Sequence, residues 1–293
     1  MNIVFFLHDI ADAGKFEQLL LWLKSRYRMI GSHEVKEFYY GGIHMRNCCH
    51  ITIDDGWKST YDNVFPVLKK YNVPASIFVS AAKCEQQENF WYQEITAYDS
   101  FRLKRIITDR RLFDLNIEKI PLDHIFKALK IDIIHSVLEE YRQTYSPPPL
   151  PRNNMNISEL LEMDKSGLVE IGAHTLTHPI LALESDQRSE AEIRGSISRL
   201  EEILGHNVTT FAYPNGISGI DFTAREIAVL RQCRIELAYS VNNGQMNKHG
   251  DPLTIPRVCS RSRLKLGPIG LKLPSLHDQL KTREKLLHNR IKN

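Results

Sequence analysis

Residues 50–57 read His-Ile-Thr-Ile-Asp-Asp-Gly-Trp, a short apolar run that ends in two adjacent carboxylates and a glycine. Isoleucine and threonine are β-branched and favour strands, so we predict a buried strand that ends before Asp54. Gly56 permits a sharp exit from such a strand. Aspartates at such a place often serve only to cap a helix or to bind backbone N–H groups. Asp54 and Asp55 therefore indicate a site only if other parts of the chain support them.

Similar runs recur along the chain, and most of the gaps between them have helical periodicity. Phe16, Leu19, Leu20 and Leu23, for example, follow the i, i+3, i+4, i+7 pattern of an amphipathic helix. Strands that alternate with helices indicate an α/β fold with a parallel sheet, and about seven strands suit a closed or nearly closed barrel whose chemistry lies at the carboxyl ends of the strands. The runs predicted as strands are 3–7, 50–53, 75–80, 168–171, 209–212, 237–241 and 253–258.

The alternation breaks between about 83 and 150. Helices are predicted over about 101–115 and 122–145, before a proline-rich stretch that stops the second one. We interpret 83–150 as a helical insertion in a barrel of 1–260 rather than as a separate domain. The remaining residues, 261–293, are interpreted as a basic tail that forms a helix.

Composition and charge exclude several classes of protein. Hydrophobic residues make up 42% and charged residues 25%, which excludes a disordered chain, a coiled coil and a collagen-like repeat. The net charge of +3 is too small for a surface built to bind nucleic acid, so no nucleic-acid partner is expected. The charge is uneven, because 257–293 holds ten Lys/Arg and two Asp/Glu, or +8, which leaves −5 on 1–256.

The basic tail suggests a weak, reversible contact with an anionic membrane surface or a lipid-linked sugar. The alternative is a solvated helix that packs on the barrel through its few apolar residues. Those residues are Leu276, Leu280, Leu287 and Ile291.

The cysteines and the start of the chain favour a cytoplasmic protein. The five cysteines are odd in number and form no C-x-x-C pair, which indicates reduced thiols. No Lys or Arg precedes the apolar run 3–7, whereas a signal peptide has a basic start and a longer apolar stretch. No apolar stretch approaches the ~20 residues that cross a bilayer.

Two further motifs follow predicted strands. His174 and His178 lie four residues apart, and on one helical turn they would face the same side and suit a divalent metal. The Tyr213-Pro214-Asn215-Gly216 turn offers backbone amides to an anion. Because all three motifs follow strands, they project onto the same edge of the sheet. Two histidines and one aspartate leave metal positions open, which is typical of hydrolytic metal enzymes.

At these motifs the sequence resembles the polysaccharide deacetylase family, also called the NodB-homology or carbohydrate esterase 4 family. The resemblance rests on T-x-D-D-G, H-T-x-x-H-P and F-A-Y-P-x-G, in that order, and covers about 1–82 and 153–258. The last motif resembles a subgroup with a permuted motif order. The family implies a distorted (β/α) barrel and a metal-dependent hydrolase. Its members remove acetyl groups from N-acetylated sugars, and release acetate and a free amine.

Carried over position by position, the resemblance implies that Asp54 is the general base. It also implies that Asp55, His174 and His178 bind the metal. Zinc is the metal expected, with cobalt, nickel, iron and manganese as alternatives. The backbone N–H beside the turn, near Asn215, is expected to help hold the oxyanion.

Two roles, the arginine that pairs with the base and the acid that protonates the amine, have no direct match in the three motifs. Many members carry an arginine in the third motif that pairs with the base, where this chain has Ala212. We expect Arg257 to replace it, and the alternative for Arg257 is a surface charge that opens the basic tail. For the acid that protonates the leaving amine, we prefer His8, at the end of the first predicted strand, to His277 in the tail. The alternative for His8 is a buried structural histidine.

Two other functions are compatible with these residues. One is a metal-dependent hydrolase of a formyl or cyclic amide, on a small molecule or a lipid-linked sugar. The other is a carbohydrate-binding protein with a silent site, against which the complete set of two aspartates and two histidines argues.

Overall fold

The computed structural model describes residues 1–259 and 286–289. These residues form two compact units, one made of 1–88 and 152–259 and the other of 89–151 and 286–289. Each unit buries an apolar core of its own.

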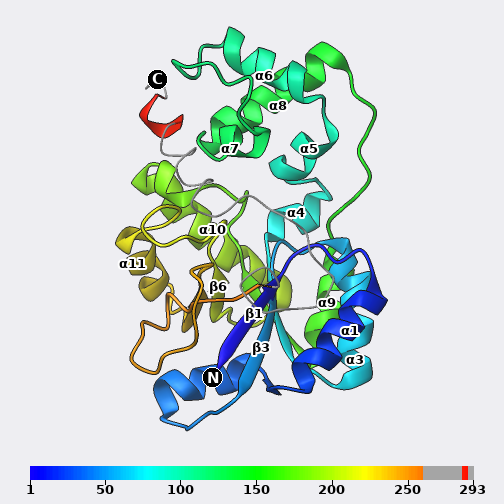
Figure 1. Cartoon of the computed structure of the whole chain (residues 1–293), viewed down its shortest axis with the longest axis vertical. Coiled ribbons are helices and arrows are strands. Elements are labelled where there is room, and N and C mark those ends of the chain that lie inside the picture. Colours follow the sequence, from blue (N-terminus) through cyan, green and yellow to red (C-terminus); the bar gives the residue numbers. More distant parts are fainter. Residues whose placement is uncertain (260–285, 290–293) are drawn as a thin grey trace. The chain divides into compact units, whose positions relative to one another are not determined.

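The first unit is built on a parallel seven-stranded sheet (Figure 1). The strand order is β1-β3-β4-β5-β6-β7, and β2 pairs with the first half of β3. The strands are β1 (Ile3–Leu7), β2 (Arg28–Ile30), β3 (Cys48–Ile53), β4 (Ala75–Val79), β5 (Val169–Ala173), β6 (Thr210–Ala212) and β7 (Leu237–Tyr239). The sequence does not predict β2, because three residues are too few to show an alternating pattern.

A closing segment, residues 252–258, joins the two edges of this sheet. On the β7 side, the Ala238 N–H donates to the Pro252 carbonyl oxygen at 2.8 Å. On the β1 side, the Val258 N–H donates to the Val4 carbonyl oxygen at 2.8 Å. The sheet is therefore curled, and the closing segment connects its first strand to its last.

The prediction of a regular strand over 253–258 is wrong. The segment makes only isolated bridges, through Ile255 on one side and Val258 on the other. Pro256 lies between these two residues. A proline has no N–H to donate to a strand ladder, so the segment crosses from one edge to the other instead of following one strand.

Helices cover the outer face of the sheet, as α1, α3 and α9 show beside β1 and β3 (Figure 1). Alternate residues of β3, namely Cys49, Ile51 and Ile53, belong to the same apolar cluster as Leu20 of α1 and Leu68 of α3. The helices of this unit are α1 (Ala13–Lys24), α2 (Ser32–Lys36), η1 (Glu37–Gly41), η2 (Thr60–Val64), α3 (Phe65–Tyr71), α4 (Ala81–Gln86), α9 (Ile157–Lys165), η3 (Leu181–Leu183), α10 (Asp186–Leu204) and α11 (Ala224–Gln232).

The second unit is helical. Its helices are α5 (Trp91–Ala97), α6 (Ser100–Asp109), α7 (Leu122–Phe126) and α8 (Ile131–Tyr145). Both predicted helices were too long. The first ends early because Arg111 adopts a left-handed φ of 50°, and the second is split because Lys130 is extended.

The two ends of the stretch 89–151 meet, because the Asn89 side chain donates to the Pro151 carbonyl oxygen at 3.0 Å. We propose on this ground that the stretch is an insertion. Because its two ends lie side by side, the stretch adds little to the entropic cost of folding the first unit.

Of the predicted tail, only 286–289 are described. Leu286 is fully buried in the core of the second unit. The predicted membrane-contacting positions Leu276, Leu280 and Ile291 lie outside the described residues, as does His277. Within the described part of the chain, no helix combines the length and the apolar character needed to cross a bilayer.

The inner face of the sheet is partly polar. His50 Nε2 lies 3.0 Å from Ser76 Oγ, and both side chains are fully buried. Ser76 pairs in register with Glu170 of β5. Burial, with a smaller contribution from the nearby charge of Glu236, raises the pKa of Glu170 from 4.5 to about 6. At neutral pH, Glu170 is therefore an ionised side chain in surroundings that favour its protonated form.

We expect Glu170→Gln to make the protein more stable at neutral pH. The folded state holds the Glu170 proton more tightly than the unfolded chain, so wild-type stability should fall as pH rises from 4.5 to about 6. A shift of this size corresponds to about 2 kcal/mol at neutral pH. Urea unfolding measured across this range should show the decline in the wild type and in an exposed control, Glu202→Gln. A decline that persists in Glu170→Gln would contradict the assignment.

Candidate active site

Side chains from four segments meet at the carboxyl ends of the strands. His8 follows β1, Asp54 and Asp55 follow β3, and His174 follows β5. Arg257 comes from the closing segment and contacts Asp54. The sequence motifs, though far apart in the chain, therefore meet at one edge of the sheet.

Asp55, His174 and His178 bring three potential ligand atoms together. Asp55 Oδ1 lies 3.2 Å from His174 Nε2 and 3.5 Å from His178 Nε2. The ligand atoms lie within 4.8 Å of one another, and all three side chains are buried. Within the described residues, Asp55 Oδ1 has no hydrogen-bond partner. A buried carboxylate oxygen that faces two imidazole nitrogens fits a divalent cation bound among them.

The tautomer of His174 and the protonation of His178 and Asp55 suit metal binding, whereas Asp55 and Asp54 raise the pKa of His174 against the effect of burial. His174 Nδ1 lies 2.7 Å from the Ala212 carbonyl oxygen, which can only accept, so the proton belongs on Nδ1 and Nε2 faces Asp55. Burial lowers the pKa of His178 and favours its neutral form. Burial opposes ionisation of Asp55, but the two imidazoles hold the pKa of this carboxyl well below its usual value. One carboxylate and two ring nitrogens suit zinc and related metals.

The two histidines meet through an irregular loop. The predicted helical turn over 174–178 is wrong, because these residues form no helix. Thr175 and His178 both have a left-handed φ of 62°, and Pro179 disfavours a helical conformation in the residue before it. Left-handed backbone at non-glycine residues is uncommon and is concentrated at functional sites. Asp55, with φ of 76°, shares this property.

Glu192 of α10 holds this loop, a role that is not among those predicted from the sequence. Its carboxylate accepts hydrogen bonds from the N–H groups of Leu176 and Thr177 at 3.0 and 2.9 Å, and from the Thr177 hydroxyl at 2.7 Å. Glu192 is only 1% exposed. Ile193, Ile197, Leu200 and Leu204 have the spacing of an amphipathic helix, and a carboxylate directly before Ile193, beside the apolar face of that helix, is the signal that could identify Glu192.

Arg257 forms a bidentate ion pair with Asp54. Nη1 and Nη2 each donate to one carboxylate oxygen at 2.7 Å. Nε donates to the Ser240 carbonyl oxygen at 2.9 Å, and Nη1 also donates to Thr52 Oγ1 at 3.2 Å. Burial opposes ionisation of Asp54, but Arg257 lowers the pKa of this carboxyl below its usual value. Asp54 is therefore paired with an arginine even though the third motif has Ala212.

His8 lies beside Asp54 without a hydrogen bond to it. Its Nε2 is 3.9 Å from Asp54 Oδ2, and its side chain is 49% exposed. The ring of Phe6 contacts the His8 ring edge-on, with centroids 5.6 Å apart. His8 is thus a half-exposed group next to a buried carboxylate.

The turn that contains Asn215 leaves the sheet from β6. It begins directly after Ala212 and Tyr213, and the Ala212 carbonyl is the one that contacts His174. Asn215 has a left-handed φ of 57°. Its side-chain Nδ2 is buried and has no hydrogen-bond partner within the described part of the chain. The turn therefore carries an unsatisfied amide donor.

Trp57, which had no predicted role, contacts the second oxygen of Asp55. Its indole Nε1 donates to Asp55 Oδ2 at 3.1 Å. This bond leaves Oδ1 directed at the two histidines. Partners of this kind orient a ligand and increase its affinity for metal.

Comparisons with known proteins agree with these motifs. The model of the family described as polysaccharide deacetylase matches residues 42–238. The chain is similar to poly-beta-1,6-N-acetyl-D-glucosamine N-deacetylase of Staphylococcus aureus strains MSSA476 and N315, with 24% identity over 258 residues. The match covers 84% of this chain and 66% of these relatives, so the chain spans slightly less than two thirds of their length.

Solved structures confirm the predicted fold. IcaB from Ammonifex degensii superposes with a TM-score of 0.60 at 19% identity, over 97% of this chain and 96% of that one. A Streptococcus pyogenes deacetylase, PplD, in complex with acetate gives a TM-score of 0.57 at 16% identity, over 88% and 92%. The curled parallel sheet with outer helices is therefore the distorted (β/α) barrel that the sequence predicted.

We expect Arg257→Met to lower the free energy of unfolding by about 3–5 kcal/mol, because it leaves the Asp54 charge buried and unpaired. The double variant Asp54→Leu with Arg257→Met removes both charges and should recover most of this loss. Chemical denaturation measures all three proteins. Arg231→Met, which breaks an exposed pair with Asp251, is the control and should cost under about 1 kcal/mol. An equally small effect of Arg257→Met would contradict the account.

We also expect His174→Ala and His178→Ala each to lose bound metal while the fold is kept, because barrel stability depends mainly on the core and the opposite edge. Metal content measured by mass spectrometry and folding measured by circular dichroism test this. His206→Ala is the control, since that histidine is exposed and contacts Asp164. Wild-type metal content in either ligand variant would contradict the assigned ligands.

Proposed function

The chain belongs to the polysaccharide deacetylase family, and on this premise we propose that it removes acetyl groups from the N-acetylated sugars of a polysaccharide. The reaction consumes water and releases acetate and a free amine. The observation that carries the proposal is the buried group of Asp55, His174 and His178 beside an Asp54 carboxylate that Arg257 keeps ionised.

We propose zinc as the metal, held by Asp55, His174 and His178, because one carboxylate and two imidazoles are ligands that zinc prefers in catalytic sites. When bound, such a metal polarises an amide carbonyl and makes a nearby water more acidic. Trp57 and the Ala212 carbonyl keep Asp55 and His174 oriented for it.

Asp54 is the proposed general base. It takes the proton from the water that attacks the acetyl carbonyl, which requires the carboxylate form. Arg257 supplies that form by lowering the pKa of Asp54 against the effect of burial. The bidentate pair also fixes both carboxylate oxygens, so the proton is accepted in one orientation.

Asn215 and His8 complete the proposed mechanism. A backbone N–H near Asn215 stabilises the oxyanion that forms on the acetyl group, a contribution of roughly 3–4 kcal/mol for one well-placed donor. Protonated His8 then donates to the nitrogen as the C–N bond breaks, so that the amine leaves as a neutral group. Its half-exposed position allows the ring to be reprotonated from solvent.

The substrate proposed is a polymer that contains N-acetylglucosamine. The Staphylococcus aureus relatives are named for poly-beta-1,6-N-acetyl-D-glucosamine, and this name supports the sugar and the acyl group without fixing the linkage. Acetate release should therefore be measured on β-1,6-linked and β-1,4-linked N-acetylglucosamine oligomers. We expect release that a chelator abolishes and added zinc restores. Release of formate from N-formyl sugars, without acetate from any oligomer, would contradict the proposal.

We expect Asp54→Asn to retain metal and to lose about 10²–10⁴-fold in kcat, because an amide cannot accept the proton. The measurement is acetate release together with metal content. Asp164→Asn, at a surface pair with His206, is the control and should keep the wild-type rate. Loss of metal from Asp54→Asn would instead make Asp54 a ligand.

A further inference from the structure

The loop that carries His8 has little contact with the carboxylate that His8 faces. The last backbone hydrogen bond of the strand is that from Asp54 N–H to the Leu7 carbonyl oxygen, at 3.0 Å. His8 follows directly, and its ring is 3.9 Å from Asp54 Oδ2 and half exposed. Exposed loops of this kind open readily. Apart from the edge-on contact with the Phe6 ring, the position of this histidine depends on what holds the residues that follow it.

Three hydrogen bonds from one helical turn, residues 58–63, hold those residues. Ser59 Oγ donates to Asp9 Oδ1 at 2.7 Å and accepts from the Ile10 N–H, at 3.2 Å. Asn63 Nδ2 donates to the Ile10 carbonyl oxygen at 2.8 Å. Ser59 and Asn63 are four residues apart and so lie on one side of the turn. Together they hold the two residues that follow His8.

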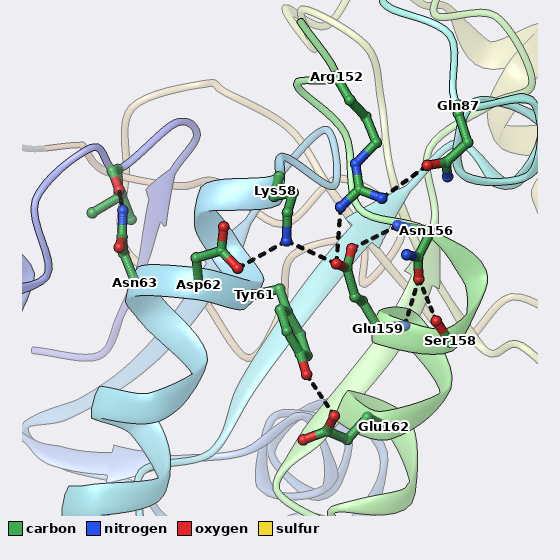
Figure 2. A network of polar contacts seen from close by, with 11 residues as sticks. Lys58, Tyr61, Asp62, Asn63, Gln87, Arg152, Asn156, Ser158, Glu159 and Glu162 are labelled. Carbon is green, nitrogen blue, oxygen red and sulfur yellow. Dashed lines mark hydrogen bonds and ion pairs between the residues drawn. The ribbon is translucent and has the colours of Figure 1, made fainter.

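The opposite side of the same turn is itself anchored (Figure 2). Lys58 Nζ donates to Asp62 at 2.9 Å and to Glu159 at 2.7 Å, and Arg152 also donates to Glu159 at 2.9 Å. The Lys58 N–H donates to the Asn153 carbonyl oxygen at 2.7 Å. Figure 2 shows Asp62 directed toward Lys58 and Asn63 on the other side of the turn. The turn is therefore a fixed support for the His8 loop.

We propose that Ser59 is a positioning residue that sets the place of His8 relative to Asp54. The inference rests on the proposed role of His8 as the acid. The stretch 54–63 carries the base at its start and holds the loop of the acid near its end. One short piece of chain thus determines the distance between the two groups that move protons.

The test is a double-mutant cycle with Ser59→Ala and His8→Ala, measured as acetate release by the zinc-loaded protein. Ser59→Ala should lower kcat about ten- to a hundredfold, with KM and zinc content unchanged, because a displacement of about 1 Å is enough for such a loss. In the His8→Ala background the same substitution should have almost no further effect, because the residue it positions is gone.

Two further variants separate positioning from folding. Ser59→Thr keeps the hydroxyl and should restore most of kcat. Ser158→Ala removes an exposed serine hydroxyl that donates to Asn156 Oδ1 at 2.6 Å, in the same network but away from the His8 loop. It should keep the wild-type rate. Thermal unfolding of every variant checks that the fold is intact.

The outcomes are distinct. Equal losses from Ser59→Ala in both backgrounds, or no loss in the wild type, would overturn the positioning role while the proposed function stands. Loss of zinc from Ser59→Ala would also overturn it, since the residue would then act through the metal ligands. A His8→Ala variant with the full wild-type rate would contradict the proposed acid and the inference together.

Discussion

The buried ion pair between Asp54 and Arg257 is the interaction on which the rest of the site depends. The two side chains are 2% and 0% exposed, and a charge in such a place is stable only beside a well-matched partner. Asp54 follows β3, whereas Arg257 lies in the segment that connects the two edges of the sheet. The same contact therefore fixes the closing segment against the sheet and keeps the proposed base ionised.

The loop 174–178, which carries both histidines, is also held by a buried carboxylate. Thr175 and His178 hold a left-handed backbone that is unfavourable for such residues. The buried Glu192 carboxylate compensates by binding two N–H groups and one hydroxyl of the loop. Asp55 is likewise held by the Trp57 indole. Local backbone cost at this site is thus offset by hydrogen bonds from neighbouring elements, which leaves the ligand atoms in fixed positions.

The sequence predicted the parallel sheet, the helices around it and the family, because these depend on local periodicity and on motifs that are continuous in the chain. It also pointed to His174 and His178, although through a helical turn that does not exist.

The roles of Glu192 and Trp57 were missed, because they depend on how distant elements pack. The apolar residues of the closing segment predict a strand, and only Pro256 argues against it. Because Ala212 stands where many members of the family carry an arginine, the sequence suggests that Arg257 replaces it. Its position beside Asp54, however, depends on tertiary contacts.

The most direct test of the account is a crystal structure of the zinc-loaded protein, with anomalous diffraction measured on both sides of the zinc edge. The account predicts one strong anomalous peak bonded to Asp55 Oδ1, His174 Nε2 and His178 Nε2. It also predicts that Arg257 still forms both hydrogen bonds to Asp54, which stays outside the coordination sphere. A peak bonded to Asp54, or a site in which Arg257 has left Asp54, would contradict the central claim that one aspartate binds the metal and the other is held as the base.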